Sequence, residues 1–77
     1  MWYNKTERRN AVKKQFGVVR IGREWRILSL HGDGNVLERG IAVSDHPTKA
    51  QAKITAQGYA RSHRKIWPED TVEIREA

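Results

Sequence analysis

The chain has 77 residues, a formal net charge of +6 at pH 7 and no cysteine. A chain of this length forms one small domain, and without cysteine it has neither disulfides nor a thiolate metal site. No apolar run reaches the roughly 20 residues that a membrane-spanning helix needs. Since the lack of cysteine also fits a reducing compartment, we expect a cytoplasmic protein that does not enter a membrane.

Residues 1–15 are polar and carry five basic side chains against one acidic one. This composition predicts either a flexible basic arm or a short helix capped by Thr6. Trp2 and Tyr3, near its start, either fold back over a small core or contact nucleic acid. Residues 16–77 are expected to form a single α+β domain.

Three strands are predicted in the first half of that domain. Residues 16–21 and 24–30 flank Gly22-Arg23, where glycine supplies the positive φ that a tight hairpin turn needs. The Gly- and Asp-rich segment 31–35 predicts a second turn, and residues 36–43 a third strand. These strands together predict an antiparallel meander.

A helix is predicted from Thr48, the expected N-cap, to about residue 63. At about 100° per residue, one side of the helix gathers Ala52, Ala56, Tyr59, Ala60 and His63. The three alanines on this side predict a close approach to the sheet. The alternating residues 71–75 predict a short final strand, which gives the order β-β-β-α-β.

Both faces of the predicted sheet are partly apolar, although one helix can cover only one of them. Strand 24–30 alternates Trp25 and Ile27 with Leu28 and Leu30. We expect the second face to be covered by the N-terminal segment, by a partner or by a second copy, unless a bulge near Leu28 swaps the faces. The residues assigned to such a partner surface are Val19, Ile21, Leu28, Leu30 and Ile54.

No motif in the sequence points to catalysis. His31, His46 and His63 lack the close pairing typical of zinc ligands. Ser29 and Ser44 have no nucleophile motif around them. Glu69 and Asp70 are interpreted as a helix cap or a solvated turn. We therefore predict a protein that is not an enzyme and that uses no metal or cofactor.

Positive charge is concentrated in residues 1–15 and 44–65, whereas residues 66–77 carry four acidic side chains and one basic one. Such a balance favours a polyanionic partner, which can be nucleic acid, an anionic membrane or an acidic protein face. The basic residues of the arm that would contact nucleic acid are Lys5, Arg8, Arg9, Lys13 and Lys14. A second basic stripe follows the helix through Lys49, Lys53, Gln57, Arg61 and Arg64 and is interpreted either as a solvated face or as a binding surface.

Residues 17–60 resemble DNA-binding domains made of a three-stranded sheet and a helix. These include the plant ethylene-response-factor domain and the arm-binding domains of phage integrases. The shared residues are Gly17, Val18, Trp25, Ile27, Thr48, Ala52, Ala56, Tyr59 and Ala60. The resemblance implies that the sheet face away from the helix enters the major groove, with Arg20, Arg23, Arg26 and Arg39 as the DNA contacts. The strand–helix–strand ending also looks like small phage and bacterial domains.

Two functions of different classes follow from these patterns. The first is a nucleic-acid-binding module that binds mainly the phosphate backbone, with DNA favoured over RNA. The second is a protein-interaction module, such as a small phage-type inhibitor or adaptor. It would bind an acidic protein, a nucleoprotein complex or its own copy in a homodimer.

Overall fold

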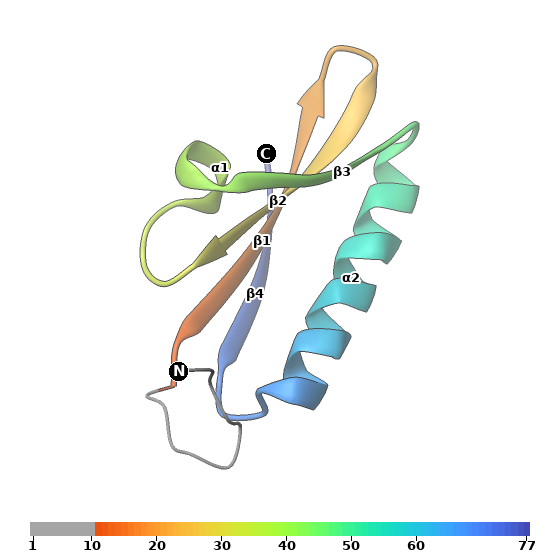
Figure 1. Ribbon diagram of the computed structural model, residues 1–77. Coiled ribbons are helices and arrows are strands. Elements are labelled where there is room, and N and C mark those ends of the chain that lie inside the picture. Colours follow the sequence, from red (N-terminus) through yellow and green to blue (C-terminus); the bar gives the residue numbers. More distant parts are fainter. Residues whose placement is uncertain (1–10) are drawn as a thin grey trace, which may run out of the picture.

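The computed structural model describes residues 11–77, so the predictions for Trp2, Tyr3, Lys5, Arg8 and Arg9 lie outside the described residues. The elements of the described part are β1 (Lys13–Ile21), β2 (Glu24–His31), α1 (Val36–Arg39), β3 (Ile41–His46), α2 (Lys49–Ile66) and β4 (Thr71–Glu76) (Figure 1). The α+β class is confirmed, as is the order of three strands, a long helix and a final strand.

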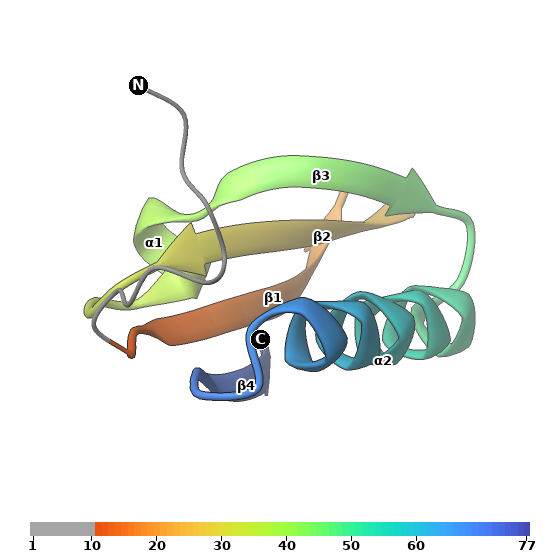
Figure 2. The same cartoon turned by 60° about the horizontal axis from the view of Figure 1, so that its bottom comes forward.

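The four strands form one sheet in the order β3-β2-β1-β4, with α2 lying along one of its faces (Figures 1 and 2). β2 is antiparallel to both β1 and β3, as a meander requires. β4 is parallel to β1, because α2 carries the chain from the β3 edge across to the opposite edge. The helix therefore connects the two edge strands.

Several predicted element boundaries are wrong, including the end of the third strand, which lies at His46 instead of residue 43. β1 begins at Lys13, so Lys13 and Lys14 belong to the sheet and not to an arm. Residues 36–39 form the short helix α1 instead of starting the third strand. The side chain of Asn35 caps α1 by accepting a hydrogen bond from the Leu37 N–H at 3.0 Å. This bond satisfies the Leu37 N–H inside the turn, whereas in a strand that N–H would have to pair with an adjacent strand.

The alanine side of α2 packs against the sheet as predicted. The Thr48 side chain accepts a hydrogen bond from the Gln51 N–H at 3.2 Å and caps the helix. The buried core consists of Phe16, Val18, Ile27, Ala52, Ala56 and Ala60. Tyr59 adds a partly buried ring whose centre lies 5.9 Å from that of Phe16. Because alanine has no side chain beyond Cβ, the helix lies close to β1 and β2.

The opposite face of the sheet is partly covered by α1, a covering element that the sequence did not predict. Val36 is fully buried. A Cβ at Gly17 would lie 3.1 Å from Val36 Cγ1 and 3.0 Å from Leu37 Cδ2. Gly40, directly after α1, approaches β2 so closely that an added Cβ would lie 2.8 Å from the Cβ of Leu28. Glycine at these two positions therefore lets α1 rest on the strands.

A buried amide fastens the loop before α1 to the same face. Gln15 is fully buried, and its Nε2 donates hydrogen bonds to the carbonyls of Gly32 at 3.1 Å and Gly34 at 2.8 Å. The register shift between β2 and β3 leaves Val43 as the extra residue, since Ile27 pairs with Ser44 and Leu28 with Ala42. This bulge lies in β3 and does not exchange the two faces of β2.

The alanine contact gives a test of the fold. Ala56→Leu inserts a larger side chain between α2 and the sheet, and we expect it to lower the free energy of unfolding by about 2 kcal/mol. Ala50→Leu is the matched control, because Ala50 is exposed on α2 and the change there should stay within about 0.5 kcal/mol. Chemical denaturation measures both. Equal effects would contradict the packing of Ala56 against the sheet.

Candidate nucleic-acid interface

The sheet face that the resemblance assigns to DNA is not an arginine surface. Arg26 is held by Asp45, with Nε 2.8 Å from Oδ1 and Nη2 3.1 Å from Oδ2. Arg20 and Arg23 are exposed at the β1–β2 hairpin, where the Arg20 Nε donates to the Gly22 carbonyl at 3.1 Å. Arg39 is exposed on α1, away from the hairpin (Figure 1). The four arginines are thus not brought together.

Lys13 and Lys14 make contacts within the sheet. Lys13 Nζ lies 2.7 Å from Glu73 Oε2 on β4. Lys14 Nζ donates to Ser29 Oγ at 2.8 Å and lies 5.4 Å from the centre of the Phe16 ring. Partial burial lowers the pKa of Lys14, an effect that the charge of Asp70 opposes. Both lysines therefore have partners inside the chain.

The first half of the helical basic stripe is paired with one carboxylate of β4. Lys49 Nζ lies 3.2 Å from Glu76 Oε1, and Lys53 Nζ lies 3.3 Å from Oε2 of the same carboxylate. Hydrogen bonds from these two lysines lower the pKa of Glu76. Lys49 also lies over the Trp25 ring, 5.3 Å from its centre. The acidic end of the sequence thus balances the basic residues at the start of α2.

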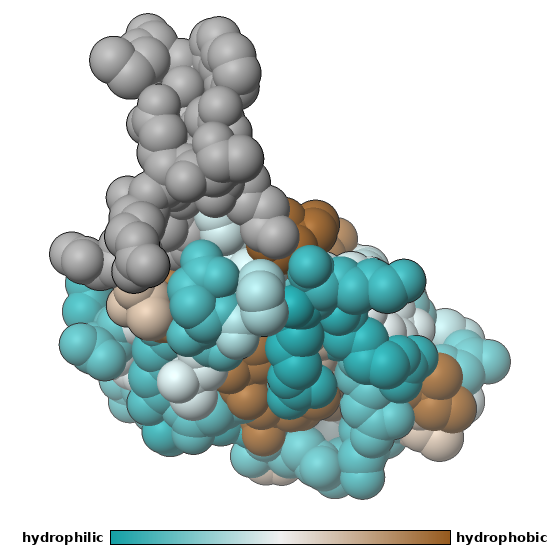
Figure 3. Space-filling view, turned by 90° about the horizontal axis from the view of Figure 1, so that it is seen from below, coloured by the Kyte–Doolittle hydropathy of each residue, from teal (hydrophilic) through white to brown (hydrophobic). Residues whose placement is uncertain are grey.

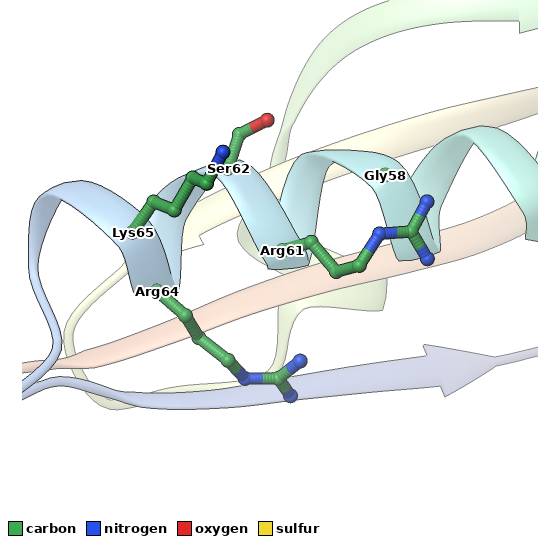
Figure 4. A pocket seen from close by; sticks show the side chains of 5 residues that line it. All are labelled: Gly58, Arg61, Ser62, Arg64 and Lys65. Atoms are coloured by element: carbon green, nitrogen blue, oxygen red, sulfur yellow. The ribbon is translucent and has the colours of Figure 1, made fainter.

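The second half of the stripe keeps its charge uncompensated. Arg61, Arg64 and Lys65 are exposed, and none of them forms an ion pair with a carboxylate of residues 11–77. Together with Gly58 and Ser62 they line an open depression of about 610 Å³ on α2, which we call the Gly58 surface. Arg61 extends along the helix toward Gly58, while Arg64 and Lys65 point to opposite sides (Figure 4).

A buried acid fixes the end of α2 that carries this surface. The Asp70 side chain is fully buried, with Oδ2 2.7 Å from His63 Nε2. Its Oδ1 accepts a hydrogen bond from the Val12 N–H at 3.0 Å. The interpretation of Asp70 as a helix cap or a solvated turn is therefore wrong. Asp70 joins the last turns of α2 to the starts of β1 and β4, which positions Arg61, Arg64 and Lys65 relative to the sheet.

A second polar group, which sequence reasoning missed, joins β3 to α2. Ser44 Oγ lies 2.8 Å from His46 Nε2 and 3.2 Å from the Tyr59 hydroxyl. Ser44 and His46 are two positions apart, so they lie on the same face of a strand. This spacing could have predicted the group, but the predicted third strand ends at residue 43. All three side chains are partly buried, so this group anchors the middle of α2.

Four of the residues assigned to a partner surface lie on the sheet face away from α2, namely Val19, Ile21, Leu28 and Leu30, whereas Ile54 lies on α2. Val19, Leu28 and Leu30 are partly buried on the sheet. Ile21, at the hairpin, is 45% exposed and Ile54, on α2, is 66% exposed. The face seen in Figure 3 is mostly hydrophilic, with hydrophobic side chains in smaller areas. The most exposed large apolar side chain among residues 11–77 is Ile41 on β3, at 75%.

Within residues 11–77, no group of three or more histidine, cysteine or acidic side chains is arranged to hold a metal ion. No helix in that part of the chain combines the length and apolar character needed to span a membrane. Comparison with protein-family models, curated proteins and solved structures found no match to this chain. The functional argument therefore depends on the chain's own residues.

The pair of Arg26 and Asp45 predicts a pH effect. The hydrogen bond from Arg26 lowers the pKa of Asp45 relative to about 3.9 in an unfolded chain. The folded state therefore binds fewer protons, so the pair stabilises the fold above about pH 4 and loses this effect as the pH falls through the lower folded pKa. NMR titration of the Asp45 carboxyl should show the low midpoint. Arg26→Gln should raise it, and an unchanged midpoint would contradict the pairing.

Proposed function

We propose that the protein binds nucleic acid through the phosphate backbone and that the Gly58 surface is its main contact. The observation that carries this proposal is the group of three exposed cations, Arg61, Arg64 and Lys65, without an ion pair in residues 11–77. Guanidinium and ammonium groups bind phosphate through charge-assisted hydrogen bonds. A cation that has no carboxylate partner can do so without first losing an internal contact.

Arg20, Arg23, Arg39 and Arg75 are also exposed without an ion pair in residues 11–77, but Arg61, Arg64 and Lys65 line one depression, and this grouping favours α2 as the binding surface. Lys13, Arg26 and Lys49 each have a carboxylate partner in the chain. A phosphate that approached them would compete with that carboxylate for the same donors. Arg61 and Arg64 have no such competitor among the described residues. The proposed contact therefore lies on the helix, whereas the resemblance implied the sheet.

The composition of the Gly58 surface favours contacts to phosphates over contacts to bases. Its lining residues are one glycine, one serine and three cations, and none of them is aromatic. Base stacking on single strands depends on aromatic side chains, and specific base readout depends on groups that reach into a groove. We expect binding that depends weakly on sequence and strongly on salt.

A matched pair of double variants tests the location. Arg61→Gln with Arg64→Gln removes two charges from the Gly58 surface, and Arg20→Gln with Arg23→Gln removes two from the hairpin. In a salt titration of binding to a mixed-sequence DNA duplex, loss of two phosphate contacts should make the slope of log K against log salt shallower by about 1.8. We expect this change only for the helix variant.

Each possible failure of this titration has a distinct meaning. Absence of duplex binding by the wild-type protein at low salt would overturn the proposed function. Equal effects of the helix and hairpin variants would show that net charge, and not the Gly58 surface, determines binding. The matched number of removed charges makes this comparison direct.

Protein interaction is a second candidate function, and the exposed apolar residues of β3 favour it. Ile41 is 75% exposed and Val43 is 46% exposed on a strand at the edge of the sheet. An edge strand can pair with a strand of another chain or of a second copy.

Under this hypothesis the molecular mass of the wild-type protein, measured by light scattering, rises with protein concentration, and the mass of the Ile41→Lys variant stays that of a monomer. A monomer at every concentration would contradict self-pairing at this edge.

A further inference from the structure

We propose that a phosphodiester group lies directly over Gly58, where α2 has no side chain, and is held there by Arg61, Ser62 and Lys65. This inference rests on the proposed function and names the point at which the nucleic-acid backbone comes closest to the helix. Its starting observation is that the fold itself gives no reason for a glycine at position 58.

The other five glycines of the chain each have a structural reason. Gly22, Gly32 and Gly34 have φ values of 62°, 106° and 123°, which other residues adopt at a cost. A Cβ at Gly17 or at Gly40 would lie within 3.0 Å of a neighbouring atom. These five positions are therefore explained by backbone conformation or by packing inside the chain.

Gly58 has neither reason. It lies inside the 18-residue helix α2, where glycine is less favourable than alanine because it gives up more backbone freedom on folding. Its φ is not positive. Apart from its own helix backbone and chain neighbours, an added Cβ would have one neighbour within 4 Å, Arg61 Nη2 at 4.0 Å, which is an ordinary contact distance. The space over Gly58 therefore has room for a side chain, and the guanidinium of Arg61 lies at its edge.

The groups around that space are hydrogen-bond donors. Arg61, Ser62 and Lys65 follow Gly58 by three, four and seven positions, so they lie on the same side of the helix. A guanidinium, a hydroxyl and an ammonium can all donate to the oxygens of a single phosphate. Figure 4 shows the Arg61 side chain directed toward Gly58. A tetrahedral anion resting on the bare helix could accept bonds from all three.

The directions of the cations favour a polymer with an anion on every unit. Arg64 points to the β4 side of α2, and Lys65 points to the opposite side (Figure 4). Arg64 can therefore bind a second anion on the β4 side while Arg61, Ser62 and Lys65 hold the phosphate over Gly58. Ile54, one turn before Gly58 and 66% exposed, offers an apolar surface to the adjoining sugar. A nucleic-acid strand that crosses α2 at Gly58 has this arrangement of groups.

Gly58→Ala tests the inference because its two expected effects have opposite signs. Alanine strengthens the helix and restricts the unfolded chain, so the melting temperature should rise. Its methyl group occupies the space of the phosphate, so duplex affinity should fall by about tenfold, the loss expected for one charge-assisted hydrogen bond. Gln51→Ala, an exposed position two turns earlier on α2, is the control and should leave duplex affinity unchanged.

The outcomes separate this inference from the proposed function. If the wild-type protein binds the duplex and Gly58→Ala binds it equally tightly, the phosphate does not lie over Gly58, although the function stands. If the wild-type protein does not bind the duplex, both fail. Inorganic phosphate should compete only weakly, and binding to phosphatidylglycerol vesicles without binding to duplex would also overturn both.

Discussion

The close packing of α2 on the sheet through Ala52, Ala56 and Ala60 is the constraint on which the rest of the structure depends. A chain of this size has few large side chains to bury, and small residues at the contact let the helix backbone cover β1 and β2 directly. The same contact fixes the rotation of the helix about its axis. Because the alanines face the sheet, Gly58 and Arg61 have to face the solvent, and the candidate interface follows from the core.

Charge compensation inside the fold determines which part of a basic surface remains available. The two edge strands supply the carboxylates: Asp45 on β3 holds Arg26, and Glu76 on β4 holds two lysines of α2. Arg61, Arg64 and Lys65, which have no ion pair within residues 11–77, lie together in the last turns of the helix. The binding surface of the molecule is therefore determined less by the net charge of +6 than by where paired and unpaired charges lie.

Local signals in the sequence were sufficient for the main elements and insufficient for the interface. The cap at Thr48 and the alanine spacing act within a few residues of each other, and both were predicted. The short helix α1 was missed because its four apolar and charged residues also fit a strand, and what decides is packing against Gly17 and Leu28. That Arg61 has no ion pair within residues 11–77 could not be predicted, because ion pairs such as Lys13–Glu73 join residues that are remote in the sequence.

The parallel pairing of β1 with β4 has a consequence for folding. β1 is a central strand of the sheet, yet one of its two neighbours is the last element of the chain. Closing this pair requires the whole intervening chain, which makes it a slow, non-local step. Until residues 71–76 emerge from the ribosome, one edge of β1 has no strand beside it. The nascent protein therefore passes through a stage in which β1, which becomes the most buried strand of the fold, is open to pairing with other chains.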